Sequence, residues 1–311
     1  VQSIQFDEVQ LSTHVLALEK VNMIWQDGDI YHAPARDLLP QPIQLNELSL
    51  CGEMTVYLAL PIIQPNKRNV SFEESTPPSR YHSHLSETHD LFTDASVADI
   101  TLLRRRAEFK LFEFGIEPNH ELDGFLYLPV AKVKRQSSGN FELDHKFIPP
   151  ILHIDACKTL ISGLKRTLNI IKAKIKTIQS NNRENEQKLI EFRSGDIVSF
   201  WLVNALNTAY TTLNHLLQYP HSHPERLFFE LLRLTGSLLT FSTAYEVDQL
   251  PQYKHHQLQE SFYQLDVILR DLLDTIISNR YLSIALKEAR PSYWIGSLES
   301  DKITRDTRLY I

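Results

Sequence analysis

Two consecutive apolar helices are predicted over Ser194 to Phe241, SGDIVSFWLVNALNTAYTTLNHLLQYPHSHPERLFFELLRLTGSLLTF. On the first helix, apolar residues recur at steps of three and four, the period of one helix face: Val198, Leu202, Leu206, Ala209, Leu213 and Leu216. Phe200, Trp201 and Val203 widen this stripe until most of the first two turns is apolar. So wide a stripe predicts a helix that neighbours cover on more than one side.

The joint between the two helices carries a start signal. Ser222 stands three residues before Glu225, which is the spacing of a capping box, and Pro224 falls in the first turn, where its missing N–H costs nothing. The second helix then has its own apolar stripe: Leu227, Leu231, Leu234, Leu238 and Phe241.

A longer helix is predicted before this hairpin, from Cys157 to Arg193. Its seam follows a strict heptad spacing and becomes polar toward the end: Ile161, Leu164, Leu168, Ile171, Ile175, Ile178, Asn182 and Asn185. Asparagine on a seam gives up stability to fix register or oligomeric state. We therefore expect these eight residues to form a self-association seam, with the helix either bending near Asn182 or projecting to meet another chain.

A fourth helix is predicted from about His255 to Ser278, with its stripe at Leu258, Phe262, Leu265, Leu269, Leu272 and Ile276. The joints at 194–195 and 219–223 are short, which forces neighbouring helices to be antiparallel, and a longer link at 246–254 precedes the last helix. The pattern predicts an antiparallel four-helix bundle over residues 157–280.

The first half of the chain is typical of strands. Alternation around the turn Gln26-Asp27-Gly28-Asp29 predicts a hairpin, and Thr55 to Ile63 predicts another strand. Residues 64–98 are polar and without periodicity, as in a functional arm or a disordered loop. Further strands are predicted at 100–103, 107–114, 125–134 and 141–143, the last two joined by a turn at 136–140.

The expected fold class is therefore α+β with three regions. Residues 1–156 would form an antiparallel β-sandwich, because no long helical patterns separate the strands as a βαβ unit requires. Residues 157–280 would form the bundle. Residues 281–311 carry short strands at 281–287 and 292–298, which are too few to fold alone, and are expected to be the truncated start of a C-terminal domain.

Composition narrows the functional classes. The chain has 311 residues, a net charge of -6 and 42% hydrophobic residues, and it lacks the basic balance usual in nucleic-acid-binding proteins. Cys51 and Cys157 stand alone, which favours a reducing compartment over a disulfide framework. No apolar run is long enough to span a membrane and no signal peptide opens the sequence, so we expect a cytoplasmic protein without direct membrane insertion.

Catalytic, cofactor and metal sites are not predicted. The common nucleotide-binding, zinc-protease and hydrolase motifs are missing from the sequence. His82, His84 and His89 lie near acidic residues, yet in a polar loop they are better explained as solvated than as metal ligands. His221, His223 and His255 are interpreted as helix-start residues; a pocket gathering them with Glu225 would favour an enzyme instead.

The sequence has two runs of positive charge. The predicted helix over 157–193 carries six positive charges, at Lys158, Lys165, Arg166, Lys172, Lys174 and Lys176. Such a run is typical of a solvated face and, alternatively, of a surface for an acidic protein. Arg104-Arg105-Arg106 is interpreted as an exposed edge that discourages strand pairing.

Several motifs in order resemble one family. The segments LDHKFIPPIL (143–152), FWLVNALN (200–207), HPERLFFELLRLTGSLLTFS (223–242) and LPQY (250–253) closely resemble the TssK family, the baseplate subunit of bacterial type VI secretion systems. The weaker segments IWQDGDIYHAP (24–34), VYLALP (56–61) and YLPVAKV (127–133) follow the family's order. The resemblance covers nearly the whole chain.

This resemblance implies a homotrimeric, non-enzymatic adaptor without a cofactor. It implies an N-terminal β shoulder, similar to shoulder domains of phage receptor-binding proteins, that contacts the wedge proteins TssF and TssG. A helical neck and a head that docks on TssL and TssM of the membrane complex would follow. The family's opening RPLW and PQHFQQ-like motifs and most of its head are missing here, so we expect a fragment with an incomplete wedge-binding surface and little docking on the membrane complex.

Two other functional classes stay open. A phage-tail-like receptor-binding or fibre-attachment protein would share the architecture but bind cell-surface glycans. An enzyme would need convergent ionisable groups in a cavity.

Overall fold

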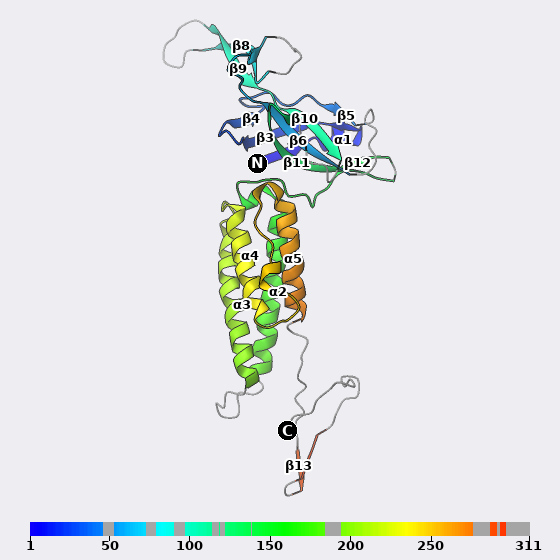
Figure 1. The fold of residues 1–311 in the computed structure, drawn as a ribbon, viewed down its shortest axis with the longest axis vertical. Coiled ribbons are helices and arrows are strands. Elements are labelled where there is room, and N and C mark those ends of the chain that lie inside the picture. Colours follow the sequence, from blue (N-terminus) through cyan, green and yellow to red (C-terminus); the bar gives the residue numbers. More distant parts are fainter. Residues whose placement is uncertain are drawn as a thin grey trace.

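The computed structural model describes residues 1–45, 53–72, 79–89, 97–113, 118, 122–137, 139–183, 194–275, 287–290 and 293–296. A β-rich part occupies one end of an elongated molecule, and four long helices extend from it side by side (Figure 1). The α+β class predicted from the sequence is confirmed.

Two antiparallel sheets contribute most of the core of the β-rich part. One has the order β1 (Ser3–Phe6), β3 (Leu18–Ile24) and β4 (Ile30–Ala33). The other has the order β10 (Glu108–Glu113), β6 (Glu53–Pro61), β11 (Phe125–Arg135) and β12 (Phe141–Leu143). The short elements α1 (Glu8–Ser12), β2 (Val15–Leu16) and β5 (Ile43–Gln44) complete this region, and α1 was not expected.

Both predicted hairpins are confirmed. The first pairs Ile24 with Ile30 and Val21 with Ala33 around the Asp-Gly-Asp turn, where Gly28 has a φ of 87° that favours glycine. The second pairs β11 with β12 around a turn in which Gly139 has a φ of 89°. Alternation of buried and exposed side chains identifies such strands because it follows the pleat.

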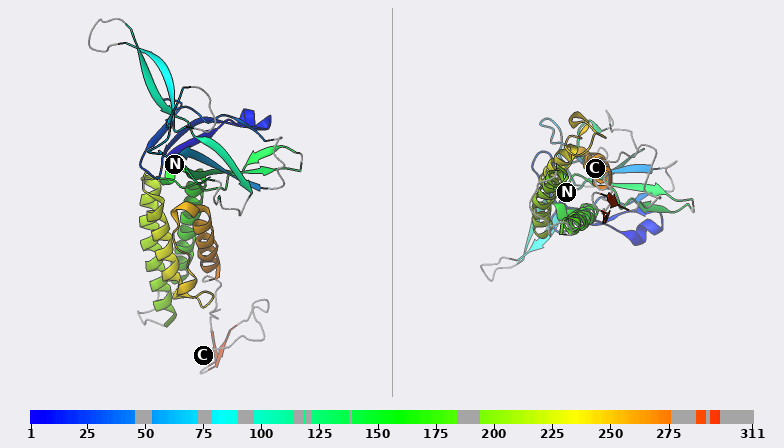
Figure 2. Two further views of the ribbon diagram at one scale, coloured as in Figure 1. Left: turned by 45° about the horizontal axis from the view of Figure 1, so that its top comes forward. Right: turned by 90° about the horizontal axis from the view of Figure 1, so that it is seen from below.

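A third sheet forms a projecting arm, of which the sequence predicted only the strand at 100–103. β7 (Val70–Ser71), β8 (Tyr81–Thr88) and β9 (Ala98–Arg105) lie in this order, and β8 and β9 extend as a ribbon away from the rest of the β-rich part (Figure 2). Of the two interpretations of residues 64–98, an arm or a disordered loop, β8 favours the arm, although the strand itself was not predicted. The strand escaped recognition because both of its faces are largely open to solvent, so its side chains do not alternate between apolar and polar.

The four helices are α2 (Lys158–Arg183), α3 (Ser194–Gln218), α4 (Pro224–Leu239) and α5 (Leu258–Thr275). Single turns of 3-10 helix lie at η2 (Ile154–Ala156), η3 (Val247–Gln249) and η4 (His255–Gln257). Residues 184–193 of the predicted first helix lie outside the described residues. The short hairpin β13 (Lys287–Arg290) and β14 (Tyr293–Ile295) overlaps the two strands expected after the bundle.

The expected antiparallel arrangement is wrong for the last helix. His223 before α4 stacks on His255 before α5, with ring centroids 5.1 Å apart, so both helices begin at the same end. Arg166 in α2 lies 3.6 Å from Asp266 in α5, each the ninth residue of its helix, so these two helices are parallel as well. The physical reason is the link over 240–254, which runs back along the 16-residue helix α4 before α5 starts (Figure 1).

The start of α4 differs in one detail from the prediction. His223, not Ser222, is the N-cap: its Nδ1 accepts a hydrogen bond from the Glu225 N–H at 3.3 Å. Ser222 lies one residue too early, and its hydroxyl donates instead to the carbonyl of Tyr219 at the end of the preceding helix. Pro224 occupies the first turn as predicted.

A continuous hydrophobic cluster joins the two parts. It runs from buried strand residues such as Leu58 through Ile151 and Ile154 to Leu206 and Leu265 in the helices. The connecting segment is also tied to the joint between α3 and α4, because the Ile154 N–H donates to the Ser222 carbonyl at 3.0 Å.

Candidate functional site

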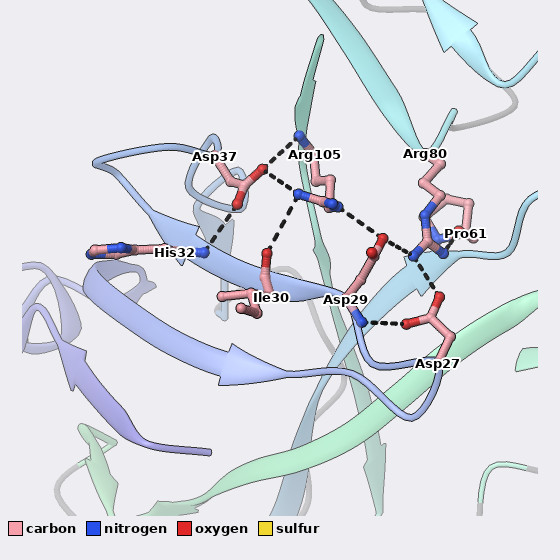
Figure 3. A network of polar contacts seen from close by, with 8 residues as sticks. All are labelled: Asp27, Asp29, Ile30, His32, Asp37, Pro61, Arg80 and Arg105. Carbon is pink, nitrogen blue, oxygen red and sulfur yellow. Dashed lines mark hydrogen bonds and ion pairs between the residues drawn. The ribbon is translucent and has the colours of Figure 1, made fainter.

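The structure's most organised polar site is a network of two arginines and three aspartates at the base of the arm (Figure 3). It begins with the tight turn between β3 and β4. The Asp29 N–H donates to Asp27 Oδ1 at 3.0 Å, and the Gly28 N–H donates to the Trp25 carbonyl at 2.9 Å. The turn therefore holds two carboxylates next to each other, each about one-third exposed.

Arg80, which directly precedes β8, is 1% exposed and forms ion pairs with both carboxylates. Its Nη2 lies 2.6 Å from Asp27 Oδ2 and 2.6 Å from Asp29 Oδ2, while Nη1 donates to the Pro61 carbonyl at 3.0 Å. Burial opposes the charge of Arg80, but the hydrogen bonds to Asp29 and Asp27 outweigh it and raise the arginine pKa. The hydrogen bond from Arg80 is the main reason that the pKa of Asp29 is lowered.

Arg105, the last residue of β9, forms the second half of the network. Its Nε donates to Asp29 Oδ2 at 3.1 Å and its Nη1 lies 3.3 Å from Asp37 Oδ1. Asp37 is 2% exposed, and it also accepts the backbone N–H groups of His32 and Arg105, each at 3.0 Å. Three protein donors thus satisfy this buried carboxylate.

Tyr81 links the two arginines. Its ring centroid lies 5.6 Å from the Arg105 guanidinium carbon and 6.0 Å from that of Arg80, within the range of cation–π attraction. Each strand of the arm is therefore attached by an arginine at its base to the β3–β4 turn. Chemically, the network ties the base of the arm to this turn.

The arm beyond this base exposes apolar side chains. Leu85 in β8 is 65% exposed, and Ile100 and Leu103 in β9 are 40% and 52% exposed. Interfaces between proteins concentrate such side chains, whereas a monomer rarely holds them on a projecting element without function.

The predicted self-association seam lies mainly inside the chain's own helices. Leu164, Leu168, Ile171 and Ile178 are buried, and Ile161 and Ile175 pack partly buried against the same core. Asn182 lies in the last turn of α2, and Asn185 lies outside the described residues. The chain's own helices thus account for the apolar part of the seam, and its role in self-association stays a prediction.

The apolar start of α3 has the opposite outcome. The wide apolar stripe here predicted that neighbours cover the helix on more than one side. Four of the side chains are nevertheless about half exposed or more: Ile197, Val198, Phe200 and Trp201. Within this chain that prediction is wrong, because burial along the stripe of α3 begins only at Leu202.

The histidines lie in two separate places. His82 and His84 are on β8, and in the described part of the chain no group of three potential ligands has a geometry that could hold a metal ion. His223 and His255 do come together at the top of the helices, where Tyr253 Oη lies 2.8 Å from His255 Nδ1. Burial first, and then the neighbouring His223 and His256, lower the pKa of His255 to about 4.

The network was missed at the sequence level. Arg105 was interpreted as part of an exposed basic edge, and this is wrong because Asp29 and Asp37 pair with it. Arg80 lies in the polar segment for which the sequence left an arm and a disordered loop open. The signal that could have been used is the pair of acids in the Asp27-Gly28-Asp29 turn, which requires cations nearby if the turn is packed.

None of the helices in the described residues is long and apolar enough to cross a membrane.

Comparisons with known proteins agree on one family. The family model described as bacterial type VI secretion, VC_A0110, EvfL, ImpJ, VasE matches residues 1–311. The curated protein "Type VI secretion system baseplate component TssK1" of Pseudomonas aeruginosa is 26% identical over 317 residues, which cover 99% of this chain and 67% of that protein.

Solved structures give the same answer. A TssK-TssF-TssG baseplate subcomplex contains a chain with a TM-score of 0.75 and 30% identity, covering 88% of this chain and 85% of that one. TssK of the EAEC type VI secretion system, bound to a nanobody, has a TM-score of 0.72 and 31% identity, covering 88% and 90%. With the family model matching from end to end, the chain belongs to the TssK (VasE) family of type VI secretion system baseplate components.

Proposed function

We propose that this chain is a structural adaptor that joins the baseplate wedge of a type VI secretion system to the membrane complex, and that it catalyses no reaction. TssF and TssG would be its wedge partners. The observation that carries the proposal is the similarity to a chain of a TssK-TssF-TssG subcomplex over 88% of this sequence. The similar chain in a structure titled as the baseplate complex, with a TM-score of 0.80, supports the same assignment.

The division of the molecule supports this role. The β-rich part would be the shoulder-like sandwich that meets the wedge, because it carries the anchored arm with its exposed apolar residues. The helices would separate this part from the partners TssL and TssM, for which a C-terminal head is the expected docking site. The site of action would be the bacterial cytoplasm, at the inner-membrane-anchored complex.

A homotrimer is part of the proposal. The apolar residues at the start of α3 offer a surface for it, since Phe200 and Trp201 lie against each other with ring centroids 5.8 Å apart and both remain more than half exposed. Aromatic side chains of this kind dominate the energies of protein interfaces. Sedimentation equilibrium at micromolar concentration should give about three times the chain mass of 36.0 kDa.

Co-purification tests the adaptor role. The chain, tagged and co-expressed with TssF and TssG of the same secretion system, should retain both through size-exclusion chromatography. Trp201→Glu should lower the mass of the chain alone while leaving its helical circular dichroism unchanged; Tyr263→Glu, at a 68% exposed position of α5, is the matched control. Failure to retain either wedge protein would contradict the adaptor role, and a monomer at tens of micromolar would contradict the trimer.

A further inference from the structure

The outer edge of β9 is open beyond its base. β9 is the last strand of its sheet, and at its base the Leu38 N–H donates to the Arg105 carbonyl at 2.8 Å, but over residues 98–104 no strand of the described residues pairs with its outer side. Natural edge strands are guarded by lysine, proline or a bulge. β9 reads ADITLLRR: its charges lie at Asp99 near the outer end and at Arg104 and Arg105 at the base, residues 100–103 between them carry neither a charge nor a proline, and the strand pairs with β8 over eight positions without a register shift. Such a strand is a template for another strand.

The register places apolar residues on both faces of the ribbon. Leu103 lies opposite Ser83 and Thr101 lies opposite Leu85, so Leu85 and Leu103 are diagonal neighbours on one face. Ile100 and Leu102 lie on the other face, because alternate residues point to opposite sides. A strand added next to β9 would therefore bury apolar surface on both faces.

The charges of the ribbon are divided between its faces. Glu87 and Asp99 lie opposite each other on the Leu85 face, near the outer end. Arg104 lies opposite His82 on the Ile100 face, which carries no carboxylate along the paired residues of β8 and β9. Unlike Arg105, Arg104 forms no ion pair in the described part of the chain. An acidic side chain of a binding partner could therefore form an ion pair with Arg104 on this face.

The base of the ribbon is already fixed. A two-stranded ribbon is marginally stable in water, but the buried contacts of Arg80 and Arg105 hold both strands at their base. Fixing a binding element in advance reduces the entropy lost on binding. The arm is thus both preorganised and incomplete as a sheet.

We propose that the outer edge of β9 accepts an extended segment of a partner protein as an additional β-strand. The segment is apolar opposite Ile100 and Leu103 and carries an acidic side chain next to Arg104. Main-chain hydrogen bonds supply affinity and the alternating side chains supply selectivity. The inference rests on the proposed function, in which the partners are TssF and TssG.

Hydrogen exchange of the complex tests strand addition directly. An added strand pairs with the outward-pointing N–H groups of β9, so about every second amide over 98–103 should exchange at least tenfold more slowly with TssF and TssG bound than in the chain alone. Docking through side chains alone would leave these amides unchanged and would overturn the inference. Equally slow exchange in the chain alone, at a concentration where it self-associates, would assign the edge to a second copy and would also overturn it.

Variants give an independent readout. Ile100→Lys places a guarding charge on the edge strand, and Arg104→Glu reverses the charge offered to the partner; each should weaken binding of TssF and TssG about tenfold or more. Val247→Lys, at a 75% exposed position near the helices, is the control and should leave binding unchanged. If the unmodified chain binds the wedge proteins and both β9 variants bind equally well, only this inference fails. If the unmodified chain does not bind them, the proposed function fails first.

Discussion

Removing the Arg80 guanidinium should destabilise the β-rich part without affecting the helices. Arg80→Met keeps an unbranched side chain at this 1% exposed position but removes the partner of Asp27 and Asp29 and the donor to the Pro61 carbonyl. Breaking a buried ion pair costs about 3–5 kcal/mol when one charge is left behind. Here both carboxylates are about one-third exposed and Asp29 keeps Arg105, so rehydration recovers part of that cost. We expect a loss of about 3 kcal/mol.

Urea unfolding followed by tryptophan fluorescence measures this loss. Trp25 is 2% exposed and packs near Tyr31, so it reports on the β-rich part once Trp201 and Trp294 are replaced by phenylalanine. With a slope of about 2 kcal/mol per molar urea, the transition midpoint should fall by about 1.5 M. Far-ultraviolet circular dichroism should show the helical transition unchanged.

Arg36→Met is the matched control, because Arg36 is exposed and should change stability by no more than about 0.5 kcal/mol. A second check uses pH. Arg80 lowers the pKa of Asp29 below its ordinary 3.8, so this stabilisation is present above 3.8 and is lost as the pH falls through the lower folded-state pKa. The difference in the free energy of unfolding between Arg80→Met and Arg36→Met should shrink as the pH falls through that pKa. Equal midpoints for Arg80→Met and Arg36→Met at neutral pH would show that Arg80 does not stabilise the β-rich part.

Three further predictions concern the helices and the turn. The pKa of His255 falls from 6.5 to about 4 in the folded chain, so the stability that comes from keeping this ring neutral is present above pH 6.5 and is lost as the pH falls toward 4. Because the ring is partly exposed, we expect the free energy of unfolding to fall by about 1–2 kcal/mol over that range, and not to fall in His255→Gln. A helical unfolding midpoint that does not change with pH over that range would contradict this prediction. Gly28→Ala should cost about 1–2 kcal/mol from its φ of 87° alone, since nothing lies within 4 Å of the added methyl group, and an unchanged Trp25 transition would argue against that turn. Leu213→Ala, at a fully buried position of α3, should cost about 3–5 kcal/mol in thermal unfolding, whereas Tyr263→Ala, at 68% exposure, should cost less than about 0.5 kcal/mol; similar losses would mean that α3 is not packed as described.

Local patterns predicted the elements that are buried on one face. The stripe from Leu202 to Leu216 identifies α3, and the turn at Asp27-Gly28-Asp29 identifies the first hairpin, because in both cases the period of apolar residues follows the core. The family resemblance gave the correct class of protein. These signals depend only on neighbours in the sequence.

Long-range features could not be predicted. Arg80 meets Asp27 across 53 positions and Arg105 meets Asp37 across 68, so no local period connects them. The parallel course of α4 and α5 depends on where the 240–254 link runs, which its composition does not specify. The exposure of Trp201 likewise depends on how far its neighbours extend along α3. Each of these is a property of the assembled fold.

We expect the β-rich part, through its anchored arm, to be where this chain meets the wedge. A cryo-electron-microscopy map of the chain bound to TssF and TssG would show the contact itself. We predict wedge density along β8 and β9, continuous with the sheet at the outer edge of β9. Wedge density confined to α2–α5, with the arm left bare, would mean that the arm is not the wedge-binding element.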